Sequence, residues 1–149
     1  MTRQKKDNVF VDSNYFIALI NKGDSQHDEA IKISYLLDSL NIQIVISNLV
    51  FIEMVTILSQ QKGRSSATTF GNGLMHNEQI TIVHVNEALQ RKSWHTFASI
   101  TKKNMSFVDC SILTIMKDRK IKKLLTFDKK DFSSLRMKYG FSFVNNFEL

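Results

Sequence analysis

Four acidic residues are candidates for chemistry because of the apolar residues that surround them. They are Asp12, Glu53, Asp109 and Asp128. Asp12 directly follows the apolar residues 9–11, and Glu53 is the only charged residue within residues 49–58. The other two stand at a predicted helix start and just past a predicted strand. Because acidic side chains are seldom fully buried without a partner, we expect all four to point from packed elements into a cleft.

A pocket that gathers several carboxylates needs positive charge or protons to balance it. Two carboxylates about 4 Å apart repel by about 4 kcal/mol at an effective dielectric constant near 20. Oxygen ligands favour a hard cation, Mg²⁺ or Mn²⁺, and the four histidines are too scattered in the sequence for a zinc site. Mg²⁺ retains several waters, so the expected chemistry is attack of a water on a phosphate group.

The order of strands and helices predicts how these acids come together. Strands are predicted at residues 9–11, 42–46, 80–83, 123–126 and 141–144, with helical segments between them. This order predicts an α/β fold: a three-layer α/β/α sandwich with a central, mostly parallel sheet of four to five strands. Ligands bind at the carboxyl ends of the strands in such sheets. The four acids are all expected to open onto that edge.

Apolar spacing and helix breakers predict the helices. They are predicted over residues 15–20, 26–40, 49–60, 86–101 and 107–118. Residues 64–76 are predicted to be helical with a break, because Gly71, Asn72 and Gly73 interrupt the pattern. Trp94 and Phe97 lie at helical spacing, which favours packing in the core or in a dimer over stacking on bases.

Length, charge and cysteine content limit the class of protein. The 149 residues predict a single domain over residues 1–149, and the formal net charge of +6 favours a polyanionic partner. The lone cysteine, Cys110, excludes an intrachain disulfide and is expected to be a small buried residue. No signal peptide and no apolar stretch long enough for a bilayer are recognisable, so we expect a cytoplasmic protein without a membrane partner.

Lysines cluster in the second half of the chain. They are Lys102, Lys103, Lys120, Lys122, Lys123, Lys129 and Lys130. Several stand close in sequence to Asp109 or Asp128, where they could hold phosphate groups of a nucleic acid. The alternative is an ordinary solvated face, and the two interpretations are balanced for Lys129 and Lys130.

Four stretches together resemble the motifs of PIN-domain ribonucleases, most closely the VapC-type toxins of toxin–antitoxin pairs. They are residues 9–14, 48–58 and 106–110, and residues 124–128 with Phe132 beyond. The resemblance implies an endoribonuclease that depends on Mg²⁺ or Mn²⁺, with the same four acids as its catalytic and metal-binding residues. It also implies that the protein dimerises and that an antitoxin blocks its cleft.

The resemblance also implies a polar surrounding for the acids. Ser13, Asn14 and Thr126 are its implied members, and Lys129 is the candidate for positioning RNA. The spacing from Asp128 to Phe132 is longer than the family pattern, which leaves the placing of Asp128 and Asp131 open.

Within this mechanism three of the acids hold the metal directly or through water. These are Asp12, Glu53 and Asp109, while Asp128 binds a second ion or orients the attacking water. One alternative is a PIN-like module that binds RNA or a protein without cutting. Another is a metal-dependent phosphatase, although Asn14 occupies the position where phosphatases with an aspartyl nucleophile carry a second aspartate.

Overall fold

A five-stranded parallel sheet forms the centre of the computed structural model, which describes residues 7–145. Its strands, in spatial order, are β3 (Ile80–Val83), β2 (Gln43–Ser47), β1 (Asn8–Val11), β4 (Lys123–Leu125) and β5 (Ser142–Phe143). Every neighbouring pair is parallel, and Phe10 of β1 pairs with Val45 on one side and Leu124 on the other. The predicted α/β fold is confirmed, and β3 and β5 are the outer strands of the sheet.

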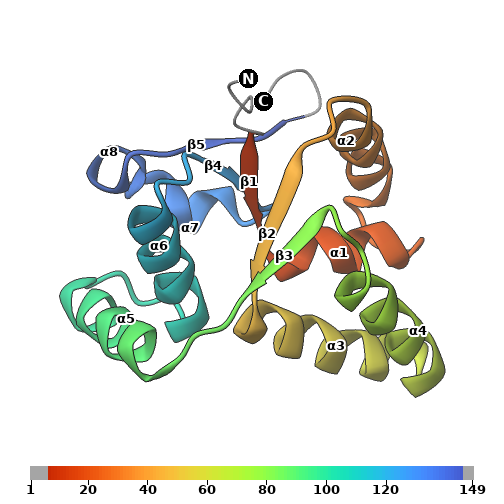
Figure 1. Cartoon of the computed structure of the whole chain (residues 1–149), viewed down its shortest axis with the longest axis horizontal. Coiled ribbons are helices and arrows are strands. Elements are labelled where there is room, and N and C mark those ends of the chain that lie inside the picture. The colour runs from red at the N-terminus through yellow and green to blue at the C-terminus, as the bar shows by residue number, and fades with distance from the viewer. Residues whose placement is uncertain (1–6, 146–149) are drawn as a thin grey trace, which may run out of the picture.

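Helices cover both faces of the sheet (Figure 1). One face carries α1 (Ser13–Ile20), α2 (His27–Ser39), α3 (Asn48–Lys62) and α4 (Arg64–Met75). The other carries α5 (Glu87–Ser99), α6 (Phe107–Arg119), α7 (Lys129–Ser133) and α8 (Arg136–Tyr139). The chain moves outward from β1 to β3 and then crosses back to β4, so its direction reverses between β1 and β4. Open α/β sheets bind their ligands at such a switch point.

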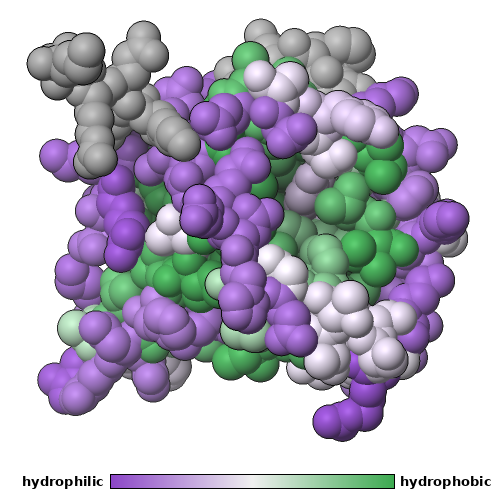
Figure 2. Space-filling model, turned by 45° about the vertical axis from the view of Figure 1, so that its right-hand side comes forward, coloured by the Kyte–Doolittle hydropathy of each residue, from purple (hydrophilic) through white to green (hydrophobic). Residues whose placement is uncertain are grey.

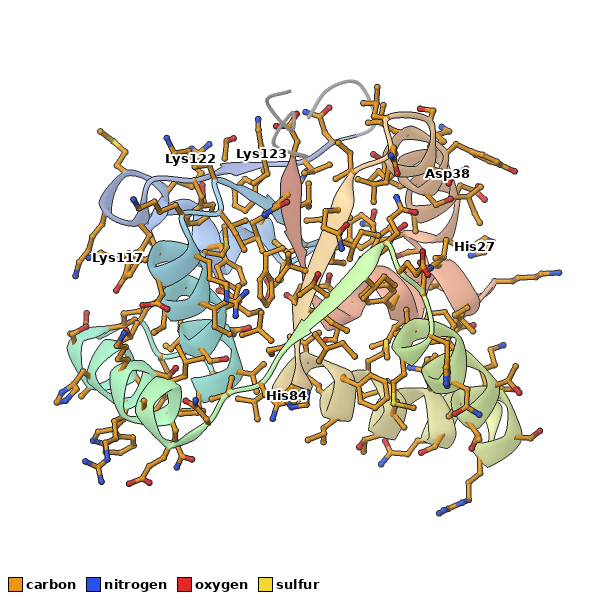
Figure 3. The ribbon with its side chains drawn as sticks, in the orientation of Figure 1. His27, Asp38, His84, Lys117, Lys122 and Lys123 are labelled. Atoms are coloured by element: carbon orange, nitrogen blue, oxygen red, sulfur yellow. The ribbon has the colours of Figure 1, made fainter. Side chains whose placement is uncertain are left out.

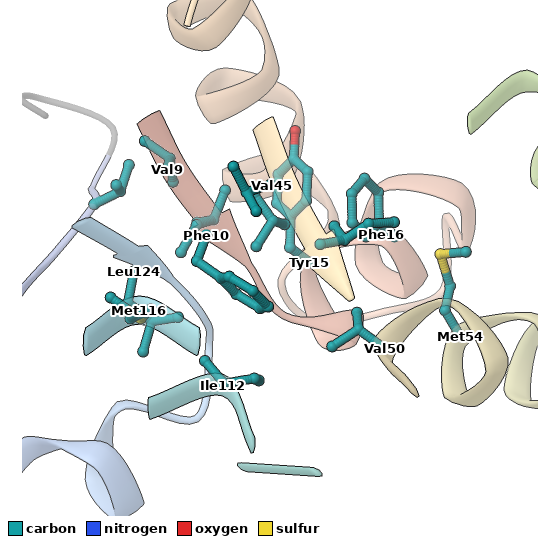
Figure 4. Packing of buried hydrophobic residues seen from close by; sticks show 14 of the residues in the cluster. Val9, Phe10, Tyr15, Phe16, Val45, Val50, Met54, Ile112, Met116 and Leu124 are labelled. Atoms are coloured by element: carbon teal, nitrogen blue, oxygen red, sulfur yellow. The ribbon is translucent and has the colours of Figure 1, made fainter. Parts of the chain in front are cut away.

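The core is densest around β1 and α6. Val9, Phe10 and Val11 are almost completely buried, as expected for a central parallel strand covered on both faces. Figure 4 shows Phe10 close to Ile112 of α6, while Tyr15 and Phe16 of α1 lie on the other side of the strand. Each side chain of this size contributes roughly 1.5–3 kcal/mol when it is fully buried. This packing fixes the end of β1, where Asp12 lies.

The helix α4 runs without interruption, so the break predicted at residues 71–73 is wrong. A Cβ atom on Gly71 would lie 3.3 Å from the Phe51 ring and 3.6 Å from Cγ2 of Val55, both on α3. This glycine therefore serves the close packing of two helices. Gly73 has no atom within 4 Å of such a Cβ, and its cost of about 1 kcal/mol in helix propensity is outweighed by the buried Leu74 beside it.

The helix α5 turns its largest aromatic residue outward. Trp94 is 58% exposed and Phe97 is 37% exposed, so the predicted core packing of these residues is wrong, while packing in a dimer stays a prediction. The physical reason is that α5 meets α6 through small polar residues: Ser93 is buried, and the hydroxyls of Thr96 and Thr114 lie 2.8 Å apart. The aromatic stripe is therefore left at the surface.

Cys110 is a free, fully buried thiol on α6, as predicted. Burial, with the nearby charge of Asp109, raises the pKa of the Cys110 thiol to about 11, so little thiolate forms near neutral pH. None of the helices in residues 7–145 combines the length and apolar character that a membrane span requires.

Candidate active site

Asp12 lies where β1 ends, at the switch point of the sheet, and only 4% of it is exposed. The backbone N–H of Ser13 donates to its Oδ1 at 2.8 Å, and the hydroxyl of Thr126 donates to its Oδ2 at 2.9 Å. The backbone N–H of Asp12 itself donates to the carbonyl of Leu125 at 2.9 Å. The carboxylate is therefore held in place from both β1 and β4.

Glu53 reaches the same edge from α3. That helix begins at the carboxyl end of β2, where the side chain of Ser47 accepts a hydrogen bond from the backbone N–H of Val50 at 3.1 Å. Glu53 follows in the second turn and is half-buried. Its Oε1 accepts a hydrogen bond from the hydroxyl of Ser13, so the glutamate is linked to the residue beside Asp12.

Asp109 approaches from the start of α6, on the opposite face of the sheet. Its backbone N–H donates to the hydroxyl of Ser106 at 3.0 Å, and its Oδ2 accepts from the backbone N–H of Ser106 at 3.0 Å. This reciprocal pair is a capping box. The half-buried carboxylate therefore stabilises the helix start while it faces the other acids.

Asp128 and Asp131 bring a fourth and a fifth carboxylate on the segment after β4. The backbone N–H of Asp128 donates to the Thr126 hydroxyl at 3.1 Å, and its side chain is exposed. Asp131, half-buried on α7, raises the pKa of Asp128 through a side-chain hydrogen bond and its charge. The ammonium group of Lys102 donates to the carbonyls of Lys130 at 2.9 Å and of Asp131 at 3.0 Å, and so anchors α7.

Electrostatic effects connect these residues into one acidic cluster, which we define as Asp12, Glu53, Asp109, Asp128 and Asp131. Burial raises the pKa of Asp12 to about 7, and the charges of Asp109 and Glu53 add to the shift, although hydrogen bonds from Thr126 and Ser13 oppose it. Burial also raises the pKa of Asp109, with further contributions from Glu53 and Asp131. The pKa of Asp128 is raised by partial desolvation of its exposed side chain, then by Asp131 and Asp109, while the charge of Lys102 lowers it.

The acidic cluster suits a divalent cation by its chemistry but is not arranged as a finished metal site. Among residues 7–145, no three His, Cys, Asp or Glu side chains are grouped so that they could hold a metal ion. Glu53 and Asp109 instead accept hydrogen bonds from Ser13 and Ser106. The donors are all carboxylate oxygens, which hard divalent cations prefer. The hydrogen bonds from the serines use Oε1 of Glu53 and Oδ2 of Asp109, so the second oxygen of each carboxylate can serve a cation.

The predicted polar neighbours lie around Asp12. The hydroxyl of Thr126 donates to Asp12 and accepts from the side-chain amide of Asn14 at 3.1 Å. The Oδ1 of Asn14 accepts from the backbone N–H of Phe127 at 3.0 Å. Asn14 and Thr126 therefore join α1 to the segment that carries Asp128.

The predicted lysines are dispersed over the molecule. Figure 3 shows Lys122 and Lys123 at the amino end of β4, whereas the acidic cluster lies at the carboxyl ends of the strands. The Nζ atom of Lys129 lies 6.0 Å from the centroid of the Phe143 ring on β5. Among the predicted lysines, Lys102 donates to backbone carbonyls of the segment that follows Asp128.

Asp131 is an acid whose place the sequence left open, and the structure brings it close to Asp128. The available signal for Asp131 was its place three residues after Asp128, one helical turn away.

Comparison with known proteins agrees with the fold. The family model described as the PIN domain matches residues 9–137. The 23S rRNA-specific endonuclease VapC20 of Mycobacterium tuberculosis is 28% identical over 126 residues, which are 85% of this chain and 92% of that protein.

Solved structures lead to the same relatives. The crystal structure of M. tuberculosis VapC20, described as a toxin that cleaves the sarcin–ricin loop, superimposes with a TM-score of 0.76 at 25% identity. That match covers 92% of this chain and 98% of the other. A toxin–antitoxin complex from Klebsiella pneumoniae gives a TM-score of 0.62 at 16% identity, covering 95% and 99% of the two chains, and shows the shared fold alone. The predicted resemblance is confirmed.

Proposed function

The chain belongs to the PIN-domain family, and from this we propose that it is an endoribonuclease that hydrolyses RNA phosphodiester bonds as the toxin of a toxin–antitoxin pair. The observation that carries the proposal is the buried carboxylate of Asp12 at the switch point of the sheet, whose pKa the charges of Asp109 and Glu53 raise in addition to burial. A module that only binds RNA has little use for carboxylates that repel one another and the phosphate backbone.

We infer that Mg²⁺ or Mn²⁺ is the cofactor and that Asp12, Glu53 and Asp109 hold it, with Asp128 or Asp131 completing the site. When bound, such a cation neutralises the carboxylates and the charge that develops on the scissile phosphate. Asp12 is prepared for this role because Ser13 and Thr126 already fix both of its oxygens. Family membership and the all-oxygen donor set support the inference.

Asp128 is suited to act on the attacking water. Its side chain is exposed, whereas Asp12 is buried, so a water that approaches from solvent meets Asp128 first. Its raised pKa makes its carboxylate a better acceptor of the proton that this water loses. Thr126 fixes the backbone of Asp128, and Lys102 anchors the helix that follows it.

We propose that an antitoxin protein and a second copy of the chain are its protein partners and that it acts in the cytoplasm. The structural neighbours include toxin–antitoxin complexes from several bacteria, which supports an antitoxin partner. Figure 2 shows hydrophobic residues at the surface of the face turned forward there. A hollow of about 210 Å³ between α1, α2, α4 and β3, lined in part by Tyr15, Phe16 and Phe70, has room for an apolar side chain of a partner.

The test is incubation of the purified protein with total RNA, with Mg²⁺, with Mn²⁺ and with excess EDTA. We expect cleavage that needs the cation and that is lost in Asp12→Asn and in Asp109→Asn, with circular dichroism confirming the fold of each variant. Asp38→Asn is the matched control, because Asp38 is exposed near the end of α2, far from the acidic cluster (Figure 3). Full activity of either cluster variant, or undiminished activity in EDTA, contradicts the proposal.

The same assay separates the alternatives. RNA binding that survives EDTA, without products under any cation, indicates a binding module. Hydrolysis of a small phosphate ester with intact RNA indicates a phosphatase.

A further inference from the structure

Three aromatic rings form a continuous surface where α5 meets the start of α6. The rings of Trp94 and Phe97 are stacked, with centroids 5.7 Å apart, and Phe97 lies 6.1 Å from Phe107. We propose that the pocket beside these rings, lined by Trp94 and Phe107, binds an unpaired base of the RNA that is cleaved. The proposal rests on the ribonuclease function and adds a binding site for the substrate outside the acidic cluster.

The pocket has the groups that recognise a base. Its volume is about 410 Å³, which lies within the range of roughly 300–1,000 Å³ for ligand pockets. Its lining combines the aromatic side chains of Trp94 and Phe107 with the polar side chains of Glu87, Gln90, Arg91 and His95. Proteins bind single-stranded RNA in this way: bases stack on aromatic rings or on arginine, and amide, guanidinium and imidazole groups bond to the base edges.

The pocket lies beside the acidic cluster along α6. Phe107 is the first residue of that helix and Asp109 is the third, so about 3 Å of helix axis separates them. Side chains two residues apart point to different sides of a helix, and so Phe107 faces α5 while Asp109 faces the other acids. An RNA strand that crosses the start of α6 can therefore reach the acids on one side of the helix and Trp94 on the other. The partial positive charge of the helix start favours the phosphate between them.

Size and charge favour a nucleotide over a protein as the occupant. The pocket has the volume of a small-ligand site, whereas a stable protein interface buries roughly 800 Å² on each partner and would have to extend well beyond the three rings. The rim is charged: Arg91 pairs with Glu87 at 2.6 Å, and these side chains are 76% and 81% exposed. An ion pair that is so exposed contributes little free energy. Arg91 can therefore exchange Glu87 for a phosphate group at little cost.

The fluorescence of Trp94 gives a direct test, because Trp94 is the only tryptophan in the chain. The probe is a short single-stranded RNA pool of random sequence, added to the full-length protein in EDTA so that no cleavage occurs. We expect quenching of the emission by this RNA and none by an abasic oligonucleotide of equal length and charge. Equal quenching by both, or by neither, overturns the proposal.

Variants test the same site through affinity. Trp94→Ala should weaken binding of the labelled RNA pool about 5- to 100-fold, the range for loss of one stacked base, whereas Trp94→Phe should stay close to wild type. In cleavage assays Trp94→Ala should raise KM and leave kcat nearly unchanged, because the pocket does not touch the reacting atoms. Tyr35→Ala, which removes an even more exposed aromatic residue from α2, is the control and should change nothing.

Two further outcomes separate this proposal from the ribonuclease function. If wild type cleaves RNA while Trp94→Ala binds and cleaves equally well, the base pocket is refuted and the nuclease stands. If RNA quenches Trp94 but no cation supports cleavage, the nuclease is refuted and the pocket remains an RNA site. Sedimentation without RNA covers the protein alternative: self-association that Trp94→Ala abolishes assigns the rings to a dimer contact and overturns the proposal.

Discussion

Replacing Asp12 with asparagine should stabilise the cation-free protein while it abolishes cleavage. Asp12 is 4% exposed, and burial together with the charges of Asp109 and Glu53 raises its pKa from 3.8 to about 7. The charged form is therefore disfavoured in the folded protein. Asparagine keeps the shape of the side chain and the acceptor for the backbone N–H of Ser13, but it carries no charge.

The sign and size of the effect follow from proton linkage. Because the folded state holds the Asp12 proton more tightly than the unfolded chain, the free energy of unfolding falls as pH rises from about 4 to about 7. With these pKa values the loss between about pH 5 and about pH 8 amounts to roughly 2–3 kcal/mol. Asp12→Asn lacks this loss. In this variant the hydrogen bond from Thr126 is weaker, which lowers the free energy of unfolding by about 1 kcal/mol at every pH.

Urea unfolding in EDTA measures the prediction over this pH range. From about pH 5 to about pH 8, the free energy of unfolding of Asp12→Asn should rise relative to that of wild type by roughly 2–3 kcal/mol. Asp38→Asn, at an exposed position, is the control, and its free energy of unfolding should change with pH as that of wild type does. If the difference between Asp12→Asn and wild type stays constant with pH, the burial of a charged Asp12 has been misjudged.

Adding a divalent cation should reverse the order of stability. A ligand that binds only the folded state stabilises it by about 2.7 kcal/mol at a hundred times its Kd. Wild type should gain this stabilisation from Mg²⁺ or Mn²⁺, and Asp12→Asn should gain far less because one of its proposed ligands is lost. Equal stabilisation of both proteins would mean that the cation binds without Asp12.

Two further predictions concern the supports of the site and of α4. Lys102→Met should lower kcat and raise the Mg²⁺ concentration needed for cleavage, because it frees the carbonyls of Lys130 and Asp131. Lys102→Arg should restore part of the lost activity. Unchanged kinetics of the methionine variant would refute this role of Lys102. Gly73→Ala should raise the free energy of unfolding by roughly 0.5–1 kcal/mol, whereas Gly71→Leu should lower it by roughly 1–3 kcal/mol through collision with α3. Thermal unfolding of both variants measures these changes. Equal effects of the two substitutions would mean that α4 is not the continuous helix described.

Local patterns were sufficient to predict the sheet and four of the acids. A short apolar run followed by Asp12 indicates both a buried strand and an acid at its carboxyl end, and this needs only neighbouring residues. The same applies to Asp109, because Ser106 three residues earlier is a visible cap. The order of the elements then predicted that these ends meet at one edge of the sheet.

Long-range contacts decide what the sequence left open. Asp131 faces the other acids on a helix that Lys102 anchors across 28 or 29 residues, and no local pattern reports such a bond. Periodicity identified the stripe with Trp94 but could not say which side of α5 faces the core. Gly71 was misread for a similar reason: a glycine that breaks a helix and one that admits a neighbouring helix look alike in one dimension.

The serine partners of the acids suggest how the cluster exists without a cation. Five carboxylates at one edge would repel strongly if all pointed inward, yet Glu53 accepts from Ser13 and Asp109 accepts from Ser106. Each of these bonds contributes on the order of 1 kcal/mol, less than the attraction of a carboxylate to a divalent cation in a buried site. The serines therefore orient two of the acids in the cation-free protein and leave one oxygen of each for a cation. Asp12 is held more firmly, since Ser13 of α1 and Thr126 after β4 fix both of its oxygens, and it is the carboxylate around which the others must gather.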